Sequence, residues 1–353
     1  MSATRPAALA LMLAAAPALA ASLPECTCRN LTSLQQDYRN AEALEAYFTL
    51  LAEHLKAYEG GMSSQAPDRG LLGQLSLGED QAYREENPPG QVMGPVEGYW
   101  GPAHVDMEPG KCIQRPEDLE AMDVGSPCRG MADAALNHEA AHRANCDRMG
   151  PENYWRQMPS EIALEEAENY RAQAAALKDE LRRVLDAAEV TLSVDWTLEI
   201  NAQDLALYGY SFSSRSEDIG GASGGDPWTM TGQGTSTGTW TKAVFAGMRC
   251  TPSGAITTEY EAKLTTDGLT FDLDLAELST SGSVSIRCPG GGGGGGPVAE
   301  AGGAGNLAEG LPVKAGDNPL PGDMAEEMRA LMAGAATVTG EGERVLSVTC
   351  EGP

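Results

Sequence analysis

Residues 190–200 read VTLSVDWTLEI, with an apolar side chain at every second position. This period of two is typical of a β-strand, whose successive side chains point to opposite faces. The alternation returns in residues 256–264, 269–275, 284–288 and 346–350, and Asp267-Gly268 between two of these segments is a strong hairpin signal. We therefore expect an antiparallel β domain over residues 190–353, arranged as a sandwich with one face in water.

Residues 289–322 interrupt this pattern with a low-complexity segment that includes seven consecutive glycines, residues 290–296. Such a composition offers little apolar surface to bury. We expect a disordered, flexible Gly-rich insertion here, followed by a short helix near residues 324–332 and a last strand.

The N-terminal part of the chain has helical spacing instead. Apolar residues three and four positions apart predict helices over residues 30–59, 131–146 and 160–189, with a Gly- and Pro-rich connection between the first two. The expected fold class is α+β, with a mostly helical domain over residues 21–189 and the β domain after it.

Residues 1–20 predict a secretory signal peptide, because Arg5 precedes an apolar run that ends in Ala18-Leu19-Ala20. No later apolar run is long enough to span a bilayer. The chain has 51 acidic and 24 basic residues and a net charge of −27, which argues against nucleic acid and anionic membranes as partners. We expect an exported protein, periplasmic or extracellular.

The eight cysteines fit that oxidising environment. An even number in an exported chain predicts up to four disulfides, although spacing does not give the pairing. Five cysteines precede residue 150 and three follow residue 249, so full pairing requires a bridge between the two parts. The disulfide candidates are Cys26, Cys28, Cys112, Cys128, Cys146, Cys250, Cys288 and Cys350.

The segment most informative about chemistry is residues 138–142, HEAAH. Histidines four apart on a helix share one face, so His138 and His142 can bind one Zn²⁺, while Glu139 can approach a water on the ion. The alternative is a pair of surface histidines on an amphipathic helix.

A catalytic zinc needs a third protein ligand. On the helix after Ser160, Glu166 falls about 40° from Tyr170, inside the apolar stripe, whereas Glu161, Glu165 and Glu168 fall on the side that faces water. A buried carboxylate is costly unless it is paired or bound to a metal. Glu166 is therefore the expected third ligand, and the alternative is a carboxylate bonded to an Arg or a helix end.

With these residues in place, the chain resembles the zincin metallopeptidases, in the gluzincin arrangement of HExxH on one helix and Glu on the next, and also exported bacterial HExxH proteins. The likeness covers residues 112–170. The metzincin extension of the motif is excluded, because Asn145 and Arg148 stand where Gly and His are needed. The resemblance implies a helical zincin-like N-terminal half and zinc-dependent hydrolysis of a peptide or protein.

Under that resemblance His138, His142 and Glu166 are zinc ligands. Glu139 is the general base that helps a zinc-activated water attack an amide carbonyl. An oxyanion also needs stabilisation, and Tyr170, His104, Tyr154 and Arg143 are candidates. Tyr170 follows Glu166 by one turn, so its alternative role is to orient that carboxylate.

A second hypothesis is a non-catalytic secreted or cell-envelope binding protein in which the β domain is the active part. It accounts for the large Gly-rich β region, which a minimal hydrolase does not need.

Overall fold

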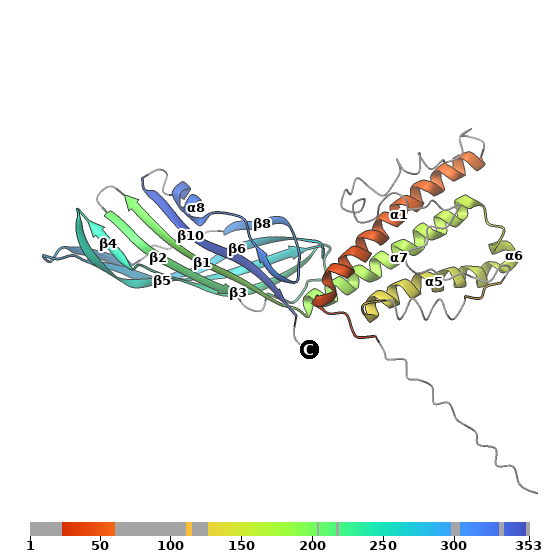
Figure 1. Ribbon diagram of the computed structural model, residues 1–353, viewed down its shortest axis with the longest axis horizontal. Helices are drawn as coiled ribbons and strands as arrows, with labels where there is room; N and C mark the ends of the chain where they lie inside the picture. The colour runs from red at the N-terminus through yellow and green to blue at the C-terminus, as the bar shows by residue number, and fades with distance from the viewer. Residues whose placement is uncertain are drawn as a thin grey trace, which may run out of the picture.

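The computed structural model describes residues 23–60, 111–114, 126–202, 205–216, 219–297, 304–331 and 335–350. The main body is an elongated β-sheet, and the long helices stand side by side at one end of it (Figure 1). The predicted signal peptide, residues 1–20, and His104 lie outside the described residues.

Ten strands of the described chain form a single sheet in the order β7-β6-β5-β3-β2-β1-β10-β9, with β4 against β2 and β5 and with β8 against β6. All of these pairs are antiparallel. The strands are β1 (Glu189–Ala202), β2 (Leu205–Ser216), β3 (Trp228–Thr239), β4 (Lys242–Phe245), β5 (Met248–Thr266), β6 (Thr270–Arg287), β7 (Gly293–Pro297), β8 (Ala304–Pro312), β9 (Gly316–Pro319) and β10 (Thr337–Thr349).

The alternation in residues 190–200 becomes the buried face of β1. Every second side chain from Val190 to Ile200 is buried in one hydrophobic core. The predicted hairpin at Asp267-Gly268 joins β5 to β6, and Gly268 adopts a φ of 94° that favours glycine at this turn. The β-rich part of the chain and its antiparallel strands therefore agree with the sequence pattern.

The predicted fold class is nevertheless wrong. Most of the regular structure in the described residues is the ten-stranded sheet, so the chain is not built on a helical zincin-like half. The pairing of β1 with β10, from Glu189 opposite Thr349 to Asn201 opposite Thr337, keeps the sheet continuous instead of dividing it in two. Alternation identifies strands, but it does not give the order in which they pair.

The Gly-rich segment is also more ordered than predicted. Its residues contribute β7, β8 and β9, and the glycine run pairs with β6 from Gly293 opposite Arg287 to Pro297 opposite Ser283. Backbone hydrogen bonds to an existing strand stabilise this edge without side-chain burial. The prediction counted only side chains, and it also overlooked Val313 and Leu320, which are buried in the core.

The helices of the described chain are η1 (Cys28–Asn30), α1 (Leu31–Glu59), α5 (Arg129–Met149), α6 (Pro151–Tyr154), α7 (Pro159–Asp186) and α8 (Met324–Leu331). None of them combines the length and the apolar character needed to cross a bilayer. α7 lies between α1 and α5 and contacts both, while the short α8 packs on β10. Glu59 at the end of α1 accepts hydrogen bonds from the backbone and side chain of Ser160, at the start of α7.

Four disulfides fasten these elements, as the cysteine count predicted. They are Cys26–Cys128, Cys28–Cys350, Cys112–Cys146 and Cys250–Cys288. The bridge between the two parts of the chain is Cys28–Cys350, which joins the start of the helices to the residue after β10.

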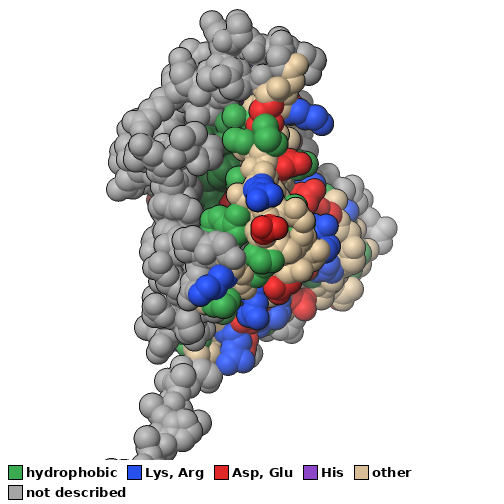
Figure 2. Space-filling model, turned by 90° about the vertical axis from the view of Figure 1, so that its right-hand side faces the viewer, with side chains coloured by type: hydrophobic (Ala, Val, Ile, Leu, Met, Phe, Trp, Pro, Cys, Tyr) green, Lys and Arg blue, Asp and Glu red, His purple; other side chains and the backbone are tan. Residues whose placement is uncertain are grey.

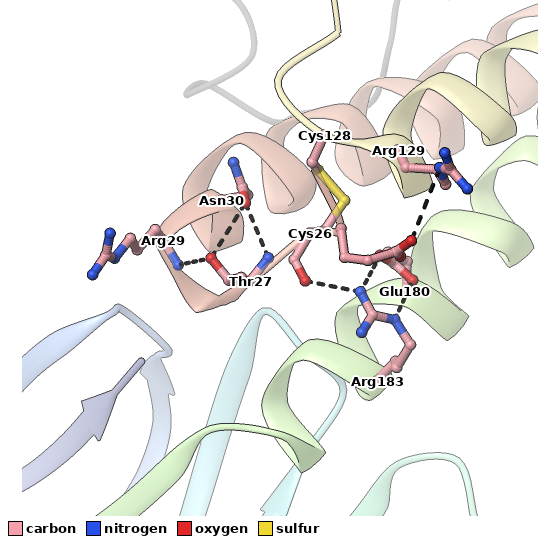
Figure 3. The surroundings of a disulfide bond; sticks show 9 residues. Cys26, Thr27, Arg29, Asn30, Cys128, Arg129, Glu180 and Arg183 are labelled. Atoms are coloured by element: carbon pink, nitrogen blue, oxygen red, sulfur yellow. Dashed lines mark hydrogen bonds and ion pairs between the residues drawn. A yellow bond between two sulfur atoms is a disulfide. The ribbon is translucent and has the colours of Figure 1, made fainter. Parts of the chain in front are cut away.

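The segment before α1 is tied to both other long helices (Figure 3). Cys26 is bonded to Cys128 immediately before α5, and its carbonyl oxygen accepts a hydrogen bond of 2.8 Å from Nη2 of Arg183 on α7. Glu180 binds the same guanidinium at 2.6 and 2.8 Å. The helices are thus fixed to one another at the end that meets the sheet.

Candidate metal centre

The candidate site lies between α5 and α7. α5 carries His138 and His142 one turn apart, and their ring centroids are 5.1 Å from each other. Both side chains face α7, where Glu166 meets them, as the predicted apolar stripe on that helix required. His138 is buried and His142 is nearly so.

The donor atoms of these three residues lie close together, and we call the group of His138, His142 and Glu166 the metal-binding triangle. The Nε2 atoms of His138 and His142 are 3.2 Å apart. Nε2 of His138 is 3.4 Å from Oε2 of Glu166, and Nε2 of His142 is 3.4 Å from Oε1 of the same carboxylate. Within the described residues this is the His-His-Glu group positioned to hold a metal ion.

The spacing fits a small tetrahedral ion. Ligand bonds of about 2.0–2.1 Å at tetrahedral angles separate neighbouring donor atoms by about 3.3 Å. The three observed distances, 3.2, 3.4 and 3.4 Å, are close to that value, with each histidine nearest to a different oxygen of Glu166. Two imidazoles and one carboxylate leave the fourth position open, which is the donor set of a catalytic zinc rather than of a closed structural site.

Glu139 lies beside this group. It is buried, and its backbone oxygen accepts a hydrogen bond of 2.5 Å from the side chain of Gln114. Its negative charge makes a small contribution to the raised pKa of His142 and of Tyr154, after the larger effects of burial and of Glu165 and Glu166. Glu139 directly follows His138 on α5, and a general base has to lie close to the metal ligands in this way.

Glu165 corrects a prediction made from helix geometry. The 100° rotation per residue placed it on the side facing water, yet it is buried. Its Oε1 atom is 2.9 Å from Nδ1 of His142, and Tyr154 and Gln157 donate hydrogen bonds of 3.1 Å to its two oxygens. The prediction failed because the end of α6 and the segment after it fold over this side of α7, which spacing on α7 alone cannot reveal.

The pKa values of His142 and Glu166 depend on the hydrogen bonds between the histidines and the carboxylates of the site. Burial alone would lower the pKa of His142, but hydrogen bonds to Glu165 and Glu166 outweigh burial and raise that pKa to about 10. Burial alone would raise the pKa of Glu166, but hydrogen bonds with His138 and His142 lower it to about 2. A metal ion that binds Nε2 of His142 must therefore displace a firmly held proton.

Two of the other candidates named from the sequence contact the histidines, and a third lies at the surface. The ring of Tyr170 packs on His138 with centroids 4.4 Å apart, so it positions that imidazole. The hydroxyl of Tyr154 lies 3.4 Å from Nδ1 of His142, which is the nitrogen turned away from the triangle. Arg143 is exposed and lies 3.9 Å from Asp147, one turn further along α5.

Asn169 is a further residue that the sequence prediction missed. It is buried, and its side-chain nitrogen is 3.2 Å from each ring nitrogen of His142. It follows Glu166 by three positions on α7, and this spacing was the available signal.

The end of the molecule at which α6 lies exposes hydrophobic side chains beside charged ones (Figure 2). Exposed apolar residues on α7 and the segment before it include Trp155, Met158, Ile162 and Leu164. Apolar groups gathered on a protein surface commonly mark a place where another molecule binds.

Comparisons with models of protein families, with curated proteins and with solved structures find no match to this chain.

Proposed function

We propose that this protein is an exported zinc-dependent metallohydrolase, and specifically a peptidase of the zincin type. The observation that carries the proposal is the close approach of the donor atoms of His138, His142 and Glu166. Their contacts of 3.2–3.4 Å suit zinc, and three protein ligands leave one position open. The four disulfides indicate an oxidising compartment, and we infer that this is the periplasm or the extracellular space.

Each residue has a distinct task in this proposal. His138, His142 and Glu166 hold the ion, which when bound supplies a Lewis acid for a carbonyl and for water. Glu139 accepts the proton of the attacking water and passes it to the leaving amine. Hydrolysis of an amide bond needs a base of this kind close to the ligands, and Glu139 is a buried carboxylate that directly follows the ligand His138 on α5.

The exposed apolar residues near α6 support a peptide or protein as the substrate. Trp155 and Met158 lie in the segment that covers Glu165, so apolar side chains of a polypeptide can bind next to the site. A small polar substrate has no apolar groups that would bind to such a surface.

Metal analysis of the purified mature protein tests the proposal. We expect about one zinc per chain, and we expect His138→Ala to lose it. Cleavage of unfolded protein substrates should require that zinc and should fall by about 100-fold or more in Glu139→Gln, which keeps the size of the side chain but removes the base. Wild-type protein without zinc, or His138→Ala with zinc retained, would overturn the proposal.

A second candidate function has its own observation. An open groove on the sheet is lined by residues of β1, β2, β3 and β10, which include the rings of Trp196 and Phe212 beside polar side chains such as Asp195, Thr237 and Glu343. A binding protein of the cell envelope can hold a ligand in such a groove without catalysis. Ligand binding that survives in Glu139→Gln, together with no peptidase activity in the wild type, would favour this function.

A further inference from the structure

His142 lies between two neighbouring carboxylates of α7, one at each ring nitrogen. Its Nε2 atom faces Glu166 at 3.4 Å, on the side of the metal-binding triangle. Its Nδ1 atom is 2.9 Å from Oε1 of Glu165. Glu165 therefore occupies the one nitrogen of His142 that the triangle does not use.

We infer that Glu165 is a positioning residue of the metal centre, which fixes the ring of His142 so that Nε2 is directed at the ion. The inference rests on the proposed function, because it concerns the same site. A metal-binding histidine commonly donates its second ring N–H to a carboxylate, which fixes the tautomer and the orientation of the ring and makes the coordinating nitrogen more basic. The 2.9 Å contact gives Glu165 this task.

The surroundings of Glu165 are built to hold it in this position. Its side chain is 8% exposed, and a carboxylate buried to this degree is costly unless its oxygens are bonded. The hydroxyl of Tyr154 donates to Oε1 and the amide of Gln157 donates to Oε2, both at 3.1 Å. Both donors come from the chain between α5 and α7, so this segment fixes the carboxylate on the side opposite to His142.

The two imidazoles are supported differently. Nδ1 of His138 is buried, and no hydrogen-bond partner for it exists in the part of the chain that the structure describes. The ring of His138 instead packs against Tyr170 at 4.4 Å. Loss of the Glu165 carboxylate therefore disturbs His142 and leaves the support of His138 unchanged.

Glu165→Gln tests the inference, because the amide keeps the size of the side chain and removes its charge. We expect zinc affinity, measured by competition with a chromogenic chelator, to fall about 10- to 100-fold. We also expect the visible absorption bands of the Co²⁺-substituted protein to shift, because they report the ligand geometry. Glu168→Gln is the matched control, since Glu168 is exposed on the same helix, and it should behave as the wild type.

The outcomes separate this inference from the proposed function. Wild-type protein that binds no zinc overturns both. Zinc bound by the wild type and equally tightly by Glu165→Gln, with an unchanged Co²⁺ spectrum, overturns the positioning role alone. Thermal unfolding in the presence of chelator shows whether Glu165→Gln folds. If Glu165→Gln does not fold, Tyr154→Phe is the deciding variant, because it removes one donor to Glu165. We expect it to lose less zinc affinity than predicted for Glu165→Gln, and an unchanged affinity contradicts the inference.

Discussion

The rings of Phe48 and Tyr170 are stacked, with centroids 5.7 Å apart and planes inclined by 7°. Phe48 belongs to α1 and Tyr170 to α7, and Tyr170 is the side chain that packs on His138 of α5. This row of three rings connects all three long helices through the candidate metal centre. The packing of α1 therefore bears on the metal ligands although α1 contributes none of them.

Phe48→Ala should remove this support. Phe48 is 5% exposed, so we expect the substitution to lower the free energy of unfolding by about 3 kcal/mol, measured by urea denaturation. Zinc affinity should fall as well, because Tyr170 is no longer held against His138. The control is Leu50→Ala on the same helix, where the side chain is 37% exposed and the effect should be small. Equal losses of zinc affinity in the two variants would contradict a link between Phe48 and the metal ligands.

The Cys112–Cys146 disulfide should matter for both stability and metal binding. It closes a loop of 34 residues, and Cys146 follows His142 by one turn of α5. Replacement of both cysteines by Ala should cost about 3–4 kcal/mol of stability, and should weaken zinc binding.

The Cys250–Cys288 disulfide provides a matched comparison, since it spans 38 residues and lies in the sheet. Its removal should cost a similar free energy, while zinc affinity stays that of the wild type. Competition with a chelator, run on both double variants at one temperature, distinguishes the two disulfides. Equal zinc affinity in both would show that the Cys112–Cys146 bond does not support the site.

Asp37 on α1 should make stability depend on pH. Burial raises the pKa of Asp37 from 3.8 to about 6 in the folded protein. Because the folded state binds this proton more tightly than the unfolded state, the charged form lowers stability, fully above pH 6 and not at all below pH 3.8.

Asp37→Asn should therefore raise the free energy of unfolding by about 1–3 kcal/mol at pH 8, with the gain shrinking between pH 6 and pH 4. Denaturation curves of the variant and the wild type at several pH values measure this gain. Asp133→Asn, at an exposed position of α5, is the matched control. If Asp37→Asn raised the free energy of unfolding by the same amount at every pH, burial would not be what raises the pKa of Asp37.

Arg344 and Glu327 should hold α8 on the sheet. The guanidinium of Arg344 on β10 is buried and binds both oxygens of Glu327, at 2.5 and 2.8 Å. Glu327→Ala leaves the buried charge of Arg344 without its carboxylate partner. We expect the free energy of unfolding, measured by heat or urea, to fall by about 2–3 kcal/mol. Glu326→Ala, at the exposed neighbouring position, should be nearly neutral. Arg344→Met combined with Glu327→Ala should recover much of the loss.

Local spacing predicted the features that a single element determines. The period of two located β1, the four-residue spacing of His138 and His142 placed them on one face, and the apolar stripe singled out Glu166. Each of these predictions needs only the geometry of one helix or strand. For that reason the core of the candidate site could be found from the sequence.

The features that were missed depend on contacts between distant segments. Glu165 is buried by Tyr154 and Gln157, which lie on another segment, and nothing on α7 alone reveals them. The single sheet depends on the pairing of β1 with β10, more than a hundred residues apart in the chain. Glycines 293–296 form a strand only because β6 offers an edge to pair with.

The covalent link between Cys28 and Cys350 determines how the fold responds to mechanical force. These residues are 322 positions apart in the chain, but their Cα atoms are separated by 5.3 Å. Tension applied to the chain outside them is carried by the sulfur–sulfur bond and bypasses both the sheet and the long helices. Stretching such a molecule from its two ends should leave the interior relaxed until that bond is reduced, and only then should the strands peel apart.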